Sequence, residues 1–191
     1  MAMLVLGLLV FFGIHSISIV ADPWRNAMAQ RLGEIPWKAL YAVLSLAGFL
    51  LILKGYGAAR LEPVVLYTPP SFLRHLAMLF MLPVFVFLLA AYLPGRIKGA
   101  LKHPMLVATK LWATAHLLVN GTLADVLLFG SFLAWAVADR ISVKRRPARP
   151  LPGPPPGMVN DIIAVAGGLG IYVAFVLWLH GSLIGIPLLT R

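Results

Sequence analysis

The first 21 residues contain no charged side chain, and segments of similar length and character recur along the 191-residue chain. A helix needs about 20 mainly apolar residues to cross a hydrocarbon core of about 30 Å. With 61% hydrophobic and 12% charged residues, the chain has more apolar surface than a soluble fold of this size buries, and too little charge for disorder. The sequence therefore predicts an all-α, polytopic transmembrane helical bundle that forms a single domain over residues 1–191.

Six segments have the length and composition of membrane spans, at about 3–21, 37–56, 74–93, 104–120, 122–139 and 159–183. The first is expected to be a retained helix, because it lacks the basic leading region and the cleavage site of a signal peptide. Residues 104–137 as one helix would be about 50 Å long, so the turn dipeptide Asn120-Gly121 is expected to divide them. The basic, proline-rich stretch at 140–157 is predicted to be a cytoplasmic linker, since prolines cannot continue a helix.

The net charge of +10 arises from 16 Lys and Arg against 6 Asp and Glu. These basic residues lie between apolar segments, which matches the bias of Lys and Arg toward cytoplasmic loops. The expected partner is therefore the lipid bilayer and not a nucleic acid. The loops after the first, third and fifth spans hold Arg25, Arg31, Lys38, Arg96, Lys98, Lys102, Arg140, Lys144, Arg145, Arg146 and Arg149, whereas the opposite side holds Lys54, Arg60, Arg74 and Arg191. Both termini are accordingly predicted on the non-cytoplasmic side.

Ionisable side chains inside spans are costly in hydrocarbon and are functional candidates by default. The candidates here are His15, Lys110, His116, Asp125 and His180, with His75 and His103 at the mouths of the third and fourth spans. The sequence contains no cysteine, which excludes disulfides, thiolate catalysis and iron–sulfur clusters. No catalytic triad motif, phosphate loop or metalloprotease pattern stands out.

Histidines in an apolar bundle raise the possibility of haem, which helical bundles hold between imidazoles from facing helices. His15 has apolar neighbours on its helix, and the spacing of four places Trp112, His116 and Asn120 on one helix face. His103 and His116 lie about 20 Å apart along a helix, so a bis-histidine site must pair residues from different spans.

The alternative is that an intramembrane histidine merely hydrogen-bonds a neighbouring helix. Lys110 is a candidate partner for a haem propionate, but it can also pair with Asp125 or extend toward the cytoplasmic face. His75 and His180 are expected near the outer surface, and together with His103 they are the alternative ligands.

Long stretches of the chain resemble the NnrU family of bacterial membrane proteins. These stretches are GIHS at 13–16, KGYGAAR at 54–60, TPPSFLRH at 68–75, HPMLVATKLWATAHLLVNG at 103–121 and LLFGSFLAWAVADRISVKRR at 127–146. The resemblance implies a protein of the bacterial inner (cytoplasmic) membrane that is linked to denitrification, in nitrite and nitric oxide reduction. A membrane reductase or an electron-transfer protein is then the expected partner.

The superfamily is similar to a plastid 15-cis-zeta-carotene isomerase, a membrane protein that binds haem b through histidines. The positions of its ligands match His15 and His116, and the resemblance therefore implies haem b with these two histidines as metal ligands. Another branch resembles a thiol S-methyltransferase that uses S-adenosylmethionine. The family pattern Asn-Gly-Asp is Asn120-Gly121-Thr122 here, so Asp125, one turn later, is the nearest substitute for that acid.

Three functions remain open from the sequence. The first, which we favour, is a cofactor protein that binds haem b through His15 and His116, with Trp112, Asn120 and Lys110 nearby. The second is a membrane isomerase or an S-adenosylmethionine-dependent methyltransferase. The third is a cofactor-free assembly partner of a reductase.

Overall fold

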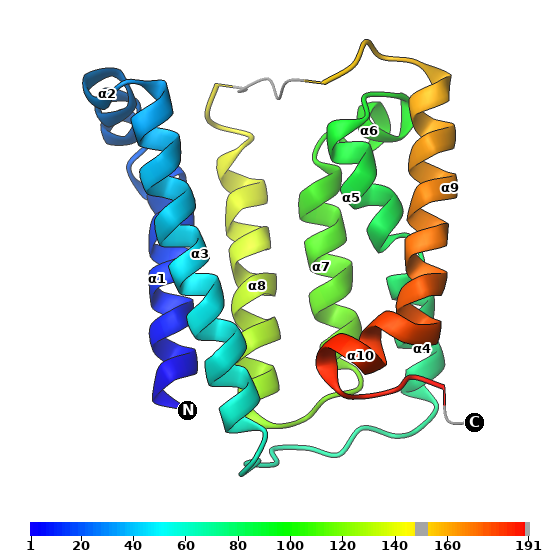
Figure 1. The fold of residues 1–191 in the computed structure, drawn as a ribbon. Coiled ribbons are helices and arrows are strands. Elements are labelled where there is room, and N and C mark those ends of the chain that lie inside the picture. Colours follow the sequence, from blue (N-terminus) through cyan, green and yellow to red (C-terminus); the bar gives the residue numbers. More distant parts are fainter. Residues whose placement is uncertain (148–152, 190–191) are drawn as a thin grey trace. The chain divides into compact units, whose positions relative to one another are not determined.

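The computed structural model describes residues 1–147 and 153–189, and Figure 1 traces the chain. Its helices are α1 (Ala2–Val20), α2 (Asp22–Leu32), α3 (Glu34–Ala59), α4 (Leu73–Met81), α5 (Val84–Tyr92), α6 (Arg96–Leu101), α7 (Pro104–Leu117), α8 (Leu123–Ser142), α9 (Met158–Ala174), the π-helical turn η1 (Phe175–Leu179) and α10 (His180–Ile184). Apart from one isolated β-bridge between Val65 and Thr122, the regular structure in the described residues is helical. The predicted all-α class is confirmed.

Four stretches among the described residues are long and apolar enough to cross a membrane: Ala2–Val20, Glu34–Ala59, Leu73–Tyr92 and Met158–Ile184. They correspond to the first, second, third and sixth predicted spans, and they make the chain a multi-pass membrane protein. The other two predicted spans differ in character. Helix α7 has 14 residues, which extend over about 21 Å, and α8 carries Asp125, Asp139 and Arg140 within its 20 residues. The count of six spans stays a prediction.

The structure adds local detail that the predicted spans and loops lacked. The segment 22–32, predicted to lie in a loop, forms α2, with Pro23 in its first turn, a position that proline favours. The short helix α6 likewise lies in a predicted loop. The third span is interrupted at Leu82 and Pro83, since proline removes a helical hydrogen bond. Residues 140–142 of the predicted linker continue α8.

The chain divides into two compact units. Among the described residues, the first unit comprises 1–70 and 120–147, and the second comprises 71–119 and 153–189. The part of the predicted linker at 148–152 lies outside the described residues, together with Arg149 and Arg191 of the charge count.

In the first unit, α1 packs along α3 and against α8, and α2 contacts the adjoining ends of α1 and α3 (Figure 1). Glycines permit the close approach of α1 and α3. A Cβ atom built on Gly7 would lie 2.6 Å from the backbone nitrogen of Ile52, and one on Gly48 would lie 2.7 Å from that of Phe11. Leu4 is completely buried in the same interface. This packing fixes the register of α1, the helix that carries His15.

In the second unit, α5 packs against α7 and α9, and α4 packs against α7. The start of α9 holds the turn that follows α5. The side-chain nitrogen of Asn160 donates hydrogen bonds to the carbonyls of Pro94 and Pro155. The carboxylate of Asp161 accepts from the backbone N–H groups of Arg96 and Ile97 at the start of α6. Asp161 thus supplies acceptors for two backbone donors that a helix start leaves without helical partners.

Candidate functional site

His15 lies in α1, in the first unit, and aromatic rings surround it. Its imidazole stacks on Phe11 with the ring centroids 4.0 Å apart. Tyr41 of α3 and Trp135 of α8 meet the imidazole in T-shaped geometry, with centroids 5.1 and 5.9 Å from it. Phe12 and Phe132 pack together beside these rings, 4.9 Å apart. We call this set the aromatic cage: Phe11, Phe12, Tyr41, Phe132 and Trp135.

The hydrogen bond of His15 defines the chemical form of its ring. Nδ1 lies 2.7 Å from the carbonyl oxygen of Phe11, and because a carbonyl only accepts, Nδ1 is the donor. In the neutral imidazole the lone pair is then on Nε2. Metal-binding histidines are commonly held in this way, with one ring nitrogen donating to a carbonyl and the other bound to the metal.

The aromatic cage also contains a buried donor that lacks an acceptor. The indole Nε1 of Trp135 is buried and has no hydrogen-bond partner among the described residues. Nearly all buried polar groups in folded proteins find a partner, so an orphaned donor beside an imidazole calls for an explanation. A bound group with an acceptor atom would provide one.

His116 lies in α7, in the second unit, and it repeats the local arrangement of His15. Its Nδ1 lies 2.8 Å from the carbonyl oxygen of Trp112, so Nδ1 is again the donor to the residue four positions earlier. The Trp112 and His116 ring centroids are 5.2 Å apart, which confirms that these two residues share a helix face. The ring of His116 is half-buried.

Of the other two predicted site residues in this region, Lys110 lies in α7 and Asn120 lies beyond its end. Asn120 follows the end of α7 at Leu117, so the shared helix face that we predicted for it is wrong. Its backbone carbonyl accepts a hydrogen bond of 2.7 Å from the Tyr67 hydroxyl. Lys110 is half-buried within α7. His15 belongs to the first unit, whereas His116, Trp112 and Lys110 belong to the second.

The three alternative ligands have separate positions within the second unit. His75 is exposed in α4, and His103 is the N-cap residue of α7. His180 begins α10, directly after the π-helical turn, and its Nδ1 lies 2.7 Å from the carbonyl of Ile186. Within the described part of the chain, no three His, Asp or Glu side chains gather as a metal-binding group.

Asp125, the nearest substitute for the family acid, is engaged in the structure of the first unit. It is 5% exposed and forms a capping box with Thr122 at the start of α8. One carboxylate oxygen accepts a hydrogen bond from the Tyr56 hydroxyl, and the other accepts from the backbone N–H of Thr122. Thr122 therefore has a role as helix cap at the position where the family pattern has an acid. The Thr-x-x-Asp spacing was the sequence signal for this cap.

The loop at 61–70 reaches this cap through backbone hydrogen bonds. The N–H groups of Leu66 and Tyr67 both donate to the carbonyl of Gly121. A side chain at position 121 would collide with the carbonyl of Tyr67, so this close approach requires glycine. Partial burial raises the pKa of the Tyr67 phenol above its ordinary value, and the nearby charge of Asp125 raises it further.

Comparison with known proteins identifies the family. The model of the NnrU family, described as NnrU protein, matches residues 3–188. The chain belongs to the NnrU family. The matched range covers residues of both units and includes His15 and His116. No curated protein matches the chain, and no solved structure does.

Sequence analysis missed the three residues of the aromatic cage that lie outside α1. Tyr41, Phe132 and Trp135 come from α3 and α8, whereas we expected only the apolar neighbours of His15 within its own helix. Phe132 and Trp135 are three residues apart, which places them on one face of α8. That spacing was the available signal, but it did not indicate which helix the face meets.

Proposed function

We propose that this NnrU protein binds haem b through Nε2 of His15 and of His116, and that it transfers electrons for nitrite and nitric oxide reduction in denitrification. One observation carries the proposal. In both histidines Nδ1 donates to the carbonyl of the residue four positions earlier, so in the neutral ring Nε2 carries the lone pair that a metal would bind. The similarity of the superfamily to a haem b isomerase, with ligands at these two positions, supports the choice of cofactor.

The chemistry of the surrounding residues fits a porphyrin. The aromatic cage offers apolar ring faces beside His15, and the orphaned indole N–H of Trp135 is a donor for a polar edge of the group. Trp112 is an apolar wall beside His116, with Asn120 further along the chain. Lys110 is the cationic partner for a propionate. When bound, haem would supply a one-electron carrier, and His15 and His116 would hold it.

The test is the optical spectrum of the protein purified in detergent. We expect a haem band with a low-spin, bis-histidine spectrum. His15→Ala and His116→Ala should each lower the haem content and change the spectrum to that of a five-coordinate iron, and the double variant should lose the band. His75→Ala, which changes an exposed histidine, is the matched control and should leave the spectrum unchanged.

Three outcomes would contradict this function. Full haem content in the double alanine variant would reject the two ligands. A haem-free preparation that binds S-adenosylmethionine stoichiometrically would favour the methyltransferase. Co-purification of a reductase whose activity survives both histidine substitutions would favour a cofactor-free assembly role.

We also propose that the chain crosses the bacterial inner membrane six times with both termini on the non-cytoplasmic side. The support is the excess of Lys and Arg in alternate loops. Because the chain has no cysteine, one introduced cysteine reports its own side of the membrane. A membrane-impermeant maleimide should label Glu62→Cys in spheroplasts and Lys102→Cys only after permeabilisation. The reverse pattern would overturn the orientation.

A further inference from the structure

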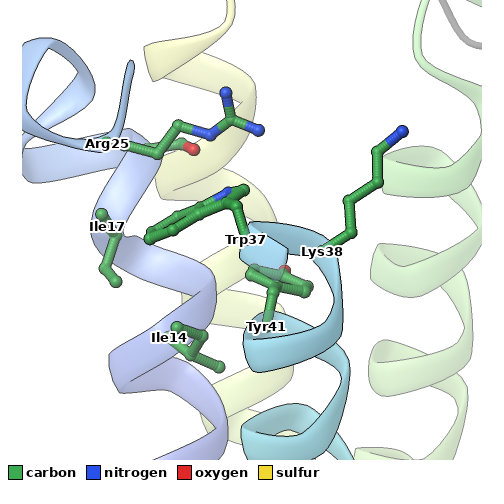
Figure 2. A pocket seen from close by; sticks show the side chains of 7 residues that line it. Ile14, Ile17, Arg25, Trp37, Lys38 and Tyr41 are labelled. Atoms are coloured by element: carbon green, nitrogen blue, oxygen red, sulfur yellow. The ribbon is translucent and has the colours of Figure 1, made fainter. Parts of the chain in front are cut away.

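A small cavity lies in the first unit, where α1 ends and α3 begins. Its volume is about 200 Å³. Figure 2 shows its lining: Ile14 and Ile17 from α1, Arg25 from α2, and Trp37, Lys38 and Tyr41 from α3. Ligand pockets for drug-sized molecules measure roughly 300–1,000 Å³, so this cavity suits a smaller group. Haem is too large to be its occupant.

The two ends of the cavity differ in polarity. The guanidinium of Arg25 lies over the Trp37 ring, with its central carbon 5.7 Å from the ring centroid. Trp37 is 4% exposed, so this wall is firmly packed. At the other end, Ile14 and the Tyr41 ring face the cavity (Figure 2). The cavity therefore combines a cation at one end with an apolar floor.

The cations at the cavity already have partners, so an added anion must compete for them. The ammonium of Lys38 pairs with Glu34, but the two side chains are 66% and 77% exposed. Exposed pairs of this kind contribute little to stability, so a phosphate can compete with Glu34 for Lys38. The nearby carboxylate of Asp22 accepts a hydrogen bond from the Asn26 side chain, and Arg25 also donates to Asn26.

The position of the cavity along the spans indicates the source of such an anion. Apart from Arg25 of α2, its lining comes from the last two turns of α1 and the first two turns of α3, both of which are long enough to cross a membrane. The ends of spans lie at the depth of the lipid headgroups. Basic pockets at this depth bind anionic headgroups, and guanidinium groups bind phosphate oxygens through paired N–H donors.

We propose that this cavity binds an anionic phospholipid, with the phosphate on Arg25 and Lys38 and the start of an acyl chain against Ile14 and Tyr41. A free phosphate has the same negative charge, but it has no apolar part to pack against Ile14 and Tyr41. The floor is the reason to favour a lipid over a soluble phosphate. The site is distinct in composition from the aromatic cage, although Tyr41 contributes to both.

The test is native mass spectrometry of the full chain in detergent, titrated with phosphatidylglycerol or phosphatidylcholine. We expect tighter binding of the first phosphatidylglycerol. The double variant Arg25→Gln/Lys38→Gln should weaken that binding about tenfold or more, since hydrogen bonds to charged groups are strong. Arg31→Gln is the matched control, because Arg31 is an exposed cation of the same helix that does not line the cavity. It should bind phosphatidylglycerol as the natural chain does.

Several results would overturn the proposal. These are equal binding of the two lipids, an unchanged affinity in the double variant, or an equal loss in Arg31→Gln. Displacement of phosphatidylglycerol by an equal concentration of inorganic phosphate would assign the cavity to a soluble phosphate instead of a lipid. If Arg25→Gln fails to fold, Lys38→Gln and Arg25→Lys provide the test. Lys38→Gln should weaken binding and Arg25→Lys should largely retain it, and the opposite order would refute the role of the charges.

Discussion

The packing of α1 on α3 makes a sharp prediction about one glycine. Gly48→Ala would place a Cβ atom 2.7 Å from the backbone nitrogen of Phe11 and 2.9 Å from its Cα. Ordinary contacts of a Cβ atom begin at 3.4 Å, so the first of these distances is too short by 0.7 Å. The obstacle is backbone and cannot rotate away. The helices must therefore separate, and contacts along the interface are lost.

The size of the effect follows from two opposing contributions. Forcing an extra carbon into a packed interior costs about 1–3 kcal/mol. Replacing glycine by alanine inside a helix returns roughly 0.5–1 kcal/mol, because alanine loses less conformational freedom on folding. Gly57 lies in the same helix, and a Cβ there meets nothing within 4 Å. Gly57→Ala should therefore retain only the favourable contribution, and the two variants should differ by about 1–3 kcal/mol.

The assay is unfolding in mixed micelles as the mole fraction of sodium dodecyl sulfate is raised, followed by far-ultraviolet circular dichroism. Gly48→Ala should unfold at a lower mole fraction than the natural chain, and Gly57→Ala at an equal or higher one. If Gly48→Ala is as stable as Gly57→Ala, close packing of α1 on α3 is not what stabilises the first unit, and the reasoning is refuted.

Three further predictions use the same unfolding assay. Tyr56→Phe removes the hydroxyl donor to Asp125 and should destabilise the chain by about 1.5–3 kcal/mol. An unchanged unfolding midpoint would mean that this hydrogen bond makes no net contribution to stability. Asp161→Ala removes the cap of α6 and should cost about 1 kcal/mol, with a neutral result arguing against the cap. Arg146→Gln leaves Asp139 as an uncompensated, largely buried charge and should cost about 3–5 kcal/mol, whereas a cost near that of an exposed ion pair would contradict its burial.

Hydropathy located most helices because it reports on each residue's own preference for lipid. The first predicted span agrees with α1 within one residue at each end. The turn at Asn120-Gly121 was also visible, since glycine and asparagine favour turns whatever surrounds them. Helix α2 was missed because a search for apolar runs cannot detect a polar helix. The interruption at Pro83 was missed because hydropathy ignores the hydrogen bond that proline lacks.

The sequence by itself determined that the chain is a membrane protein, that it is helical, and which histidines are candidates. These properties depend on side-chain chemistry and local spacing. Only the tertiary structure decided that Tyr41 and Trp135 meet His15, and that Tyr56 meets Asp125 across 69 positions. Such contacts depend on which helix faces which, and that is set by the close approach of glycines such as Gly48 to a particular backbone. A periodic pattern marks a face of a helix, but the partner of that face is fixed only when the whole unit packs.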